Sequence, residues 1–259
     1  EEDLARHVAE TVPTDERFCD ALMAVDVREE ESVWRAFDES TRIRGRRVLT
    51  RCWVAQQGLV AHVLLTGLRG DPEKVATVHA AVRRCDDTEF LEFLQKRFAT
   101  WVLSESQRLL LPGVTEPTAW IEALLETVRL TNAAVRMLEN DTAFVQTAQL
   151  TLKTVVLSAP HPNTPQTSVF LAQYINSALL SPATHRFTPS EAIELVVYVQ
   201  DRDVFEDAYV RCLARRLLRR AFAPRDAEES ALRQLQQVCG FSFATRVGRM
   251  FADVKTSES

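Results

Sequence analysis

Apolar residues recur at intervals of three and four along most of this chain, and short segments with proline or glycine interrupt them. This spacing places side chains on one face of an α-helix, whereas a half-buried strand would alternate, and we find no convincing alternation. The sequence therefore predicts an all-α, elongated fold without a β-sheet in residues 1–259. The clearest helical faces are Phe90, Leu91, Leu94, Phe98, Trp101 and Val102; Trp120, Ile121, Leu124, Leu125 and Val128; and Phe205, Tyr209, Cys212, Leu213 and Leu217.

Turn-forming residues predict where these helices end. Gly67 and Gly70–Asp71–Pro72 end one helical stretch, and Asp71 is placed to cap the next helix. Pro224 stops the helix that begins near residue 202, and Asp226 with Glu229 three residues later resembles an N-cap pair. Other breaks are expected at 111–113, 159–166, 181–182 and 188–190.

Composition narrows the class of protein. A chain of 259 residues can form one large or two ordinary domains, and scarce glycine favours helices. No apolar run approaches the roughly 18 residues of a membrane span, and the net charge of −5 argues against a nucleic-acid binder. The five cysteines are widely spaced and odd in number, which indicates reduced thiols in a cytoplasmic or nuclear protein. They are Cys19, Cys52, Cys85, Cys212 and Cys239.

Sequence motifs for chemistry are missing, and we expect no catalytic residue, cofactor or metal. The five histidines have no metal-ligand spacing, so His62 and His79 are interpreted as ordinary surface or core-edge residues. Cys85 precedes two aspartates, but a nucleophilic thiol needs a partner base that the sequence does not show. The seven glycines form no phosphate-binding loop.

Two clusters of arginine invite a functional interpretation. Arg42, Arg44, Arg46 and Arg47 are best interpreted as a solvated face. The second cluster lies on a predicted helix, where Arg211, Arg215 and Arg219 share one stripe, and no acidic residue occurs between Tyr209 and Pro224. Such a stripe either faces water or meets an acidic partner. Its members are Arg211, Arg215, Arg216, Arg219 and Arg220, and some of them are expected to turn inward and pair with Asp201 or Glu206.

The order of particular residues in the last quarter of the chain resembles the cullins, the scaffolds of cullin–RING ubiquitin ligases. The run from Tyr198 through Asp203-Val204-Phe205 to Leu213-Ala214-Arg215-Arg216-Leu217 is similar to that family's four-helix-bundle region. An acidic loop, Cys239–Gly240 and a Met250-Phe251-x-Asp253 ending follow in the family's order. Fainter similarity extends upstream through Leu171, Tyr174, Ser177, Leu179 and Leu180, the stretch from Trp120 to Phe144 with Asn132, Asn140 and Asp141, and Phe37, Glu39, Ser40 and Thr41.

This resemblance implies a domain order and a role. Residues 1–70 would end the second cullin repeat, 71–187 would form the third repeat, and 188–259 would begin the C-terminal four-helix bundle. The chain would be a non-catalytic, rigid spacer that positions a substrate adaptor relative to a RING protein and its ubiquitin-conjugating enzyme. The parts that bind the adaptor and the RING protein, and the lysine that receives a ubiquitin-like modifier, would lie outside it.

The resemblance also implies that the arginine cluster from Arg211 to Arg220 contributes to a basic surface for the acidic tail of the conjugating enzyme. An unrelated α-solenoid that binds proteins is the alternative, since it would have the same composition. Either hypothesis requires a packed C-terminal bundle, in which Phe205, Tyr209, Leu213, Leu217, Phe243 and Phe251 are expected to be buried.

Overall fold

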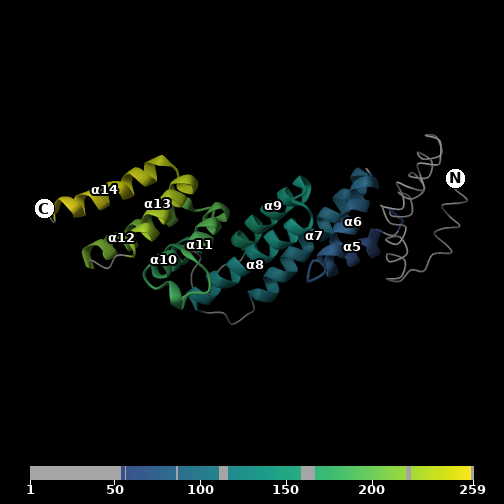
Figure 1. The fold of residues 1–259 in the computed structure, drawn as a ribbon, viewed down its shortest axis with the longest axis horizontal. Coiled ribbons are helices and arrows are strands. Elements are labelled where there is room, and N and C mark those ends of the chain that lie inside the picture. Colours follow the sequence, from purple (N-terminus) through teal and green to yellow (C-terminus); the bar gives the residue numbers. More distant parts are fainter. Residues whose placement is uncertain are drawn as a thin grey trace, which may run out of the picture. The chain divides into compact units, whose positions relative to one another are not determined.

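The computed structural model describes residues 54–55, 57–85, 87–110, 116–158, 167–219 and 223–257, with only the backbone at 84, 158, 225, 244 and 251–257. Every regular element in these ranges is helical, which confirms the predicted all-α class (Figure 1). The α-helices are α5 (Gln57–Gly67), α6 (Pro72–Cys85), α7 (Thr88–Leu109), α8 (Pro117–Met137), α9 (Thr142–Ser158), α10 (Thr167–Leu180), α11 (Pro189–Leu195), α12 (Arg202–Arg219), α13 (Arg225–Cys239) and α14 (Phe241–Ser257). Two short 3₁₀ helices are η1 (Pro182–Thr184) and η2 (Val196–Tyr198).

The described residues divide into two compact units whose limits fall inside helices α7, α8 and α9. One unit holds residues up to Trp101 together with Thr131–Ala148, and the other holds Val102–Leu130 and Gln149 onward. These limits reflect how the helices pack, and the repeat boundaries at 70/71 and 187/188 stay a prediction.

The first unit has an aromatic core on the face that the sequence predicts for α7. Phe90, Leu94 and Phe98 are at most 1% exposed. Phe98 meets Phe144 of α9 edge to face, with ring centroids 5.5 Å apart, an arrangement that aromatic pairs prefer. Gly67, the last residue of α5, allows α6 to pack closely because it has no side chain. A Cβ at this position would lie 2.9 Å from Val75 Cγ2. The predicted break at Gly67–Pro72 is confirmed, because α5 ends at Gly67 and α6 begins at Pro72. Asp71 accepts a hydrogen bond from the Lys74 N–H at 3.0 Å and is the expected cap.

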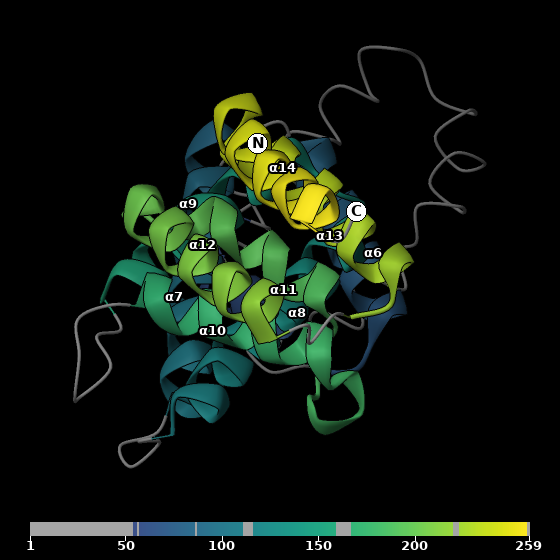
Figure 2. The ribbon, with the colours of Figure 1, turned by 90° about the vertical axis from the view of Figure 1, so that its left-hand side faces the viewer.

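The second unit contains the C-terminal bundle, in which α10 and α12 pack side by side and α14 lies against α12 and α13 (Figure 2). Its core confirms the predicted burial of Phe205, Tyr209, Leu213, Leu217 and Phe243, each at most 6% exposed. Phe251 lies outside the residues whose side chains are described. The apolar face of α12 therefore points inward, which leaves its other side for polar residues.

Helix termini follow the predicted breaks with one correction. Thr188 caps α11 through a capping box with Glu191, as the break at 188–190 suggests. The N-cap of α13 is Pro224 and not Asp226, which lies in the first turn with Glu228. Carboxylates are favourable in a first turn because they face the positive end of the helix dipole, so Asp226 stabilises the start of α13 without capping it. Gly240 joins α13 to α14 at φ +94°, a conformation that favours glycine.

Candidate functional site: the outer face of helix α12

The arginine cluster of α12 divides into an exposed set and a buried member. Arg211, Arg215 and Arg219 are exposed, whereas Arg216 is 3% exposed. Four residues are slightly more than one helical turn, so the three exposed arginines lie in one row with steps of about 6 Å. Arg220 and the earlier run Arg42, Arg44, Arg46 and Arg47 lie outside the described residues. We call Arg211, Arg215 and Arg219 the arginine row.

Arg216 is an internal ion-pair donor and does not belong to an accessible surface. Its Nη2 donates to Glu228 Oε2 at 2.9 Å, and the Glu228 side chain is only 9% exposed. Glu228 Oε1 also accepts a 3.4 Å hydrogen bond from the Ala223 N–H, so this carboxylate links α12 to the start of α13. The Arg216 guanidinium also stands 5.9 Å from the centroid of the Tyr209 ring. Arg216 thus confirms that some of these arginines turn inward as ion-pair donors, and including it in a docking surface was wrong.

The expected internal partners, Asp201 and Glu206, were wrong, because the inward arginine, Arg216, pairs with Glu228. Glu206 and Asp207 pair with Arg246 of α14, at 3.5 Å and 3.3 Å, and not with the arginines of α12. The Arg211 Nε donates to the Asp207 backbone carbonyl at 3.2 Å. No acidic side chain in the described parts of the chain lies within ion-pair distance of Arg215 or Arg219. Like charges four residues apart repel each other, so the row costs helix stability and gains no ion pair with the described residues in return.

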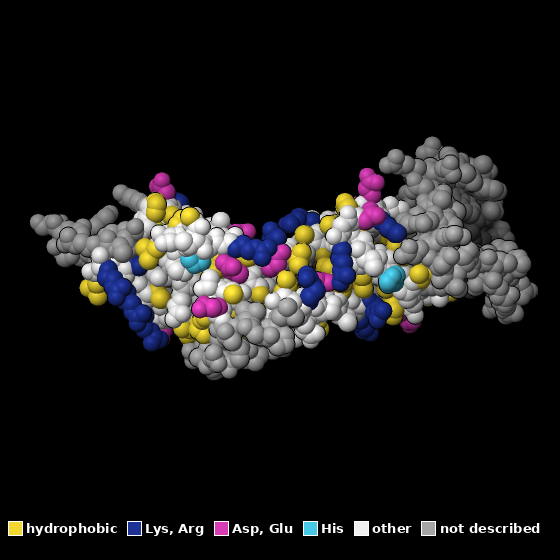
Figure 3. Space-filling model, turned by 90° about the horizontal axis from the view of Figure 1, so that it is seen from below, with side chains coloured by type: hydrophobic (Ala, Val, Ile, Leu, Met, Phe, Trp, Pro, Cys, Tyr) yellow, Lys and Arg dark blue, Asp and Glu magenta, His cyan; other side chains and the backbone are white. Residues whose placement is uncertain are grey.

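Basic side chains do not form a continuous surface on the face of the molecule shown in Figure 3. One face carries Lys and Arg side chains in separate clusters, with acidic and apolar side chains between them (Figure 3). Together with the net charge of −5, this argues against a broad surface for nucleic acid. A local row of guanidinium groups is suited to a carboxylate-bearing partner, because guanidinium forms paired hydrogen bonds with carboxylates.

A groove runs beside the arginine row, between α10 and α12. Its volume is about 490 Å³, and Arg211 and Arg215 contribute to its lining. Cys212 also lines the groove, and burial raises the pKa of its thiol. Burial raises the pKa of the Cys239 thiol to about 11. Both thiols therefore stay protonated near pH 7, which is the opposite of what a nucleophilic cysteine requires.

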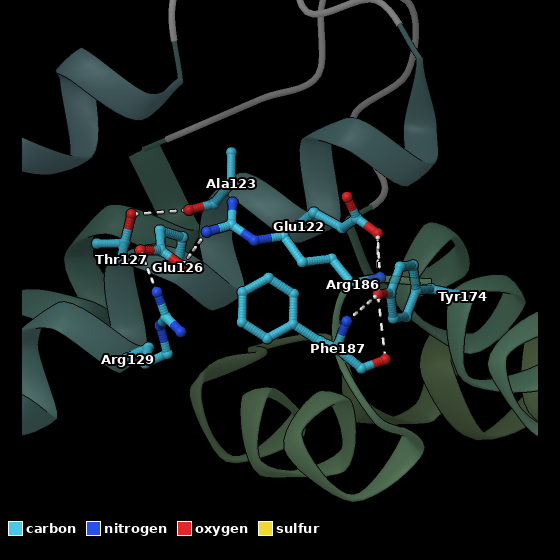
Figure 4. A network of polar contacts seen from close by, with 8 residues as sticks. All are labelled: Glu122, Ala123, Glu126, Thr127, Arg129, Tyr174, Arg186 and Phe187. Carbon is cyan, nitrogen blue, oxygen red and sulfur yellow. Dashed lines mark hydrogen bonds and ion pairs between the residues drawn. The ribbon is translucent and has the colours of Figure 1, made fainter. Parts of the chain in front are cut away.

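A polar cluster in the same unit connects α8 to the segment that precedes α11 (Figure 4). Glu126 of α8 accepts hydrogen bonds from Arg129 at 2.9 Å and from Arg186 at 3.1 Å. One turn earlier, Glu122 Oε1 accepts from the Arg186 N–H at 3.1 Å and from the Tyr174 hydroxyl at 3.2 Å. We call the contacts among Glu122, Glu126, Tyr174, Arg186 and Phe187 the junction cluster.

Phe187 sits at the centre of the junction cluster. The Phe187 N–H donates to the Tyr174 hydroxyl at 3.3 Å. The guanidinium carbons of Arg186 and Arg129 lie 5.4 Å and 6.0 Å from the centroid of the Phe187 ring. Burial is the main cause that raises the pKa of Tyr174 to about 12. Sequence reasoning did not find this cluster, because its contacts with α8 join residues that are 52 to 64 positions apart.

The remaining candidates have structural roles. His79 is 4% exposed and its Nε2 lies 3.1 Å from Asp141 Oδ2, which also accepts from Arg83 at 3.2 Å. His62 is exposed, so both histidines match their ordinary interpretation. Asp87 caps α7 by accepting from the Phe90 N–H at 2.9 Å. Within the described ranges, no group of histidine, cysteine or carboxylate side chains could hold a metal ion, and no helix has the length and apolar character of a membrane span.

Comparison with known proteins identifies the family. The sequence matches the cullin alpha solenoid domain over residues 8–259. Cullin-1 of Schizosaccharomyces pombe is 30% identical over 155 residues, which cover 55% of this chain and 20% of that protein. Cullin-2 of Caenorhabditis elegans is 28% identical over 179 residues, 66% of this chain and 22% of that protein. Cullin-3A of Arabidopsis thaliana is 44% identical over 61 residues, 24% of this chain and 8% of that protein. The chain thus spans about a fifth or less of these relatives, and its match over residues 8–259 shows that it belongs to the cullin family.

Proposed function

We propose that this chain is a segment of the non-catalytic scaffold subunit of a cullin–RING ubiquitin ligase, acting in the cytoplasm or nucleus. Membership of the cullin family supports this role and argues against an unrelated α-solenoid. In the intact protein the segment separates the end that carries a substrate adaptor from the end that carries a RING protein and its ubiquitin-conjugating enzyme. Such a spacer acts by positioning and by effective concentration, while its partners perform the chemistry.

The junction cluster is the observation that best supports a spacer. A spacer works only if its segments keep a fixed geometry, and this cluster holds the last residues of the predicted third repeat, Arg186 and Phe187, to α8 and α10. The Glu126 side chain is only 10% exposed, and two arginines compensate its charge. Removing one partner of a largely buried charge leaves the other poorly solvated, so these contacts resist opening.

Ubiquitin transfer in the intact ligase tests this role. We would compare Arg186→Ala with Arg129→Ala, because Arg129 pairs with Glu126 within α8, whereas Arg186 joins α8 to the segment before α11. Arg186→Ala should slow transfer to an adaptor-bound substrate, while substrate-independent ubiquitin-chain formation by the same complex continues. Equal substrate transfer by Arg186→Ala and Arg129→Ala would contradict the positioning role. Failure of the intact protein to bind a RING protein would overturn the proposed function altogether.

We also propose that the arginine row is a docking surface for the acidic tail of a ubiquitin-conjugating enzyme. The exposure of Arg211, Arg215 and Arg219 supports this, and so does the lack of an ion pair for Arg215 and Arg219 within the described residues. Exposed pairs contribute only about 0.2–1 kcal/mol each, so the row would act mainly by raising the encounter rate. Removing the enzyme's tail should then abolish the difference between the unmodified scaffold and an arginine-row variant; a difference that persists would contradict the proposal.

A further inference from the structure

The groove between α10 and α12 has two unlike walls. The α10 wall presents Val169 and Gln173, which carry no charge. The α12 wall has an inner strip of small or apolar side chains, Val204, Ala208 and Cys212. The volume of about 490 Å³ falls in the range of roughly 300–1,000 Å³ that is typical of ligand sites.

Charged residues line the outer edge of the α12 wall in a segregated order. Asp203, Asp207, Arg211 and Arg215 all line the groove, and each is four residues from the next. Arg246 already pairs with Asp207, at 3.3 Å. The edge is therefore acidic at the N-terminal end of α12 and basic from its middle onward, and Arg219 extends the basic part beyond the groove lining.

Compensation of the helix dipole does not account for this order. That effect favours acids in the first turn and bases in the last turn, and it fades within one turn of each end. It explains Asp203 in the first turn and Arg219 in the last. Arg211 lies in the middle of a helix that runs from Arg202 to Arg219, where the dipole offers no such stabilisation.

The spacing of the arginines matches an extended chain. Successive members of the arginine row are about 6 Å apart along the helix axis. An extended peptide advances about 6.6 Å over two residues, and its alternate side chains point to opposite sides. Carboxylates at every second residue can thus meet Arg211, Arg215 and Arg219 in register, while the residues between them face Val169 and Gln173 on the α10 wall.

We propose that this groove binds an extended peptide with acidic residues at alternate positions and uncharged residues between them. The inference rests on the proposed docking role of the arginine row and deepens it. Besides charge attraction, recognition would depend on the spacing of the carboxylates and on contacts with α10. Asp203 and Asp207 repel further carboxylates, so the acidic run ends before it reaches the N-terminal end of α12. The partner is a short protein segment, and its recognition depends on α10 as well as on α12.

Two fluorescent peptides of equal composition test the register in the intact protein. One peptide alternates glutamate with valine or serine, and the other carries the same glutamates in one contiguous block. Charge attraction alone predicts equal binding. The register predicts about fivefold tighter binding of the alternating peptide, roughly the effect of one additional exposed ion pair.

Filling the groove separates this proposal from the docking role. Gln173 is exposed, so Gln173→Trp should fold normally and should remove the preference for the alternating peptide without a change of charge. Val169→Phe is a second groove-filling variant in case Gln173→Trp is unstable. Leu218→Trp is the control, because Leu218 is 86% exposed and does not line the groove.

Each outcome of the peptide experiment decides between the two ideas. Equal binding of both peptides, or a preference that survives Gln173→Trp and Val169→Phe, would overturn the groove proposal. If charge reversal of the arginine row still weakened binding in that case, the docking role would stand without the groove. Binding that is indifferent to charge reversal as well would overturn both.

Discussion

Arg216 and Glu228 form an ion pair in the interior of the C-terminal bundle, with 2.9 Å between Nη2 and Oε2 and with both side chains at most 9% exposed. Arg215, the residue next to Arg216, is exposed. One turn of helix α12 therefore carries two arginines with opposite roles, one that stabilises the bundle and one that is available to a partner.

Breaking this buried pair should destabilise the protein strongly. Arg216→Ala leaves the Glu228 carboxylate buried without its cation, which typically costs about 3–5 kcal/mol. Arg215→Ala is the matched control and should change the free energy of unfolding by no more than about 0.5 kcal/mol. Urea unfolding followed by circular dichroism measures both values. Similar unfolding midpoints for the two variants would show that the pair does not stabilise the bundle.

Phe205 should be among the most sensitive positions of the bundle core. Its side chain is fully buried, so Phe205→Ala removes a large apolar group and leaves a cavity, at a cost of about 3–5 kcal/mol. Phe241 makes a suitable comparison because its side chain is 76% exposed. Phe241→Ala should be nearly neutral in the same thermal unfolding experiment. A near-normal melting temperature for Phe205→Ala would mean that the inward face of α12 has been wrongly assigned.

The helical faces and most breaks could be predicted because they depend on residues close together in the sequence. The burial of Phe205, Tyr209 and Leu213 follows from their spacing, and the start of α11 follows from Thr188 and Pro189. Partners across the fold could not be predicted in this way. Glu228 is twelve residues from Arg216 and belongs to the next helix, and periodicity does not determine how two helices pack.

The same limit applies to the junction cluster. Arg186 meets Glu126 sixty residues away, and nothing in either local pattern distinguishes these two residues from ordinary surface charges. The sequence also could not predict which arginines of α12 are exposed. Arg215 and Arg216 are adjacent in the sequence and differ only in which side of the helix they occupy.

Tyr174 should make the stability of the protein sensitive to alkaline pH. Burial raises the pKa of Tyr174 to about 12 in the folded protein, from 10.0 for an ordinary tyrosine. The folded state therefore holds the phenol proton more tightly than the unfolded state. The resulting stabilisation of the folded state is complete below pH 10 and is lost as the pH rises toward 12. Tyr174→Phe should reduce the loss of stability over that interval. Because burial also raises the pKa of Tyr198 and Tyr209, part of the loss should remain.

The hydroxyl of Tyr174 gives the same variant a second expected effect near neutral pH. Tyr174→Phe leaves the buried Phe187 N–H without its 3.3 Å acceptor, at a cost of about 1–3 kcal/mol. Tyr198→Phe is the control, since Tyr198 is only half-buried and lies outside the junction cluster. Equal unfolding free energies for Tyr174→Phe and Tyr198→Phe at pH 7 would contradict the assigned role of the hydroxyl. For the alkaline interval the reference is the unmodified protein, and an unchanged slope between pH 10 and pH 12 in Tyr174→Phe would contradict the role of its raised pKa.

The association rate of an acidic-tailed ubiquitin-conjugating enzyme with the intact scaffold and its RING partner tests the central claim most directly. We would replace Arg211, Arg215 and Arg219 by glutamate and compare this variant with one that reverses three exposed arginines elsewhere, Arg97, Arg136 and Arg233. Both variants change the net charge equally. Measurements at about 50 mM and about 150 mM salt would reveal steering, because salt screens exposed charges. The arginine row predicts slower association and weaker salt dependence for its own variant only, with an unchanged fold. Equal rates for the two variants at both salt concentrations would show that the row is a solvated face and not a docking surface.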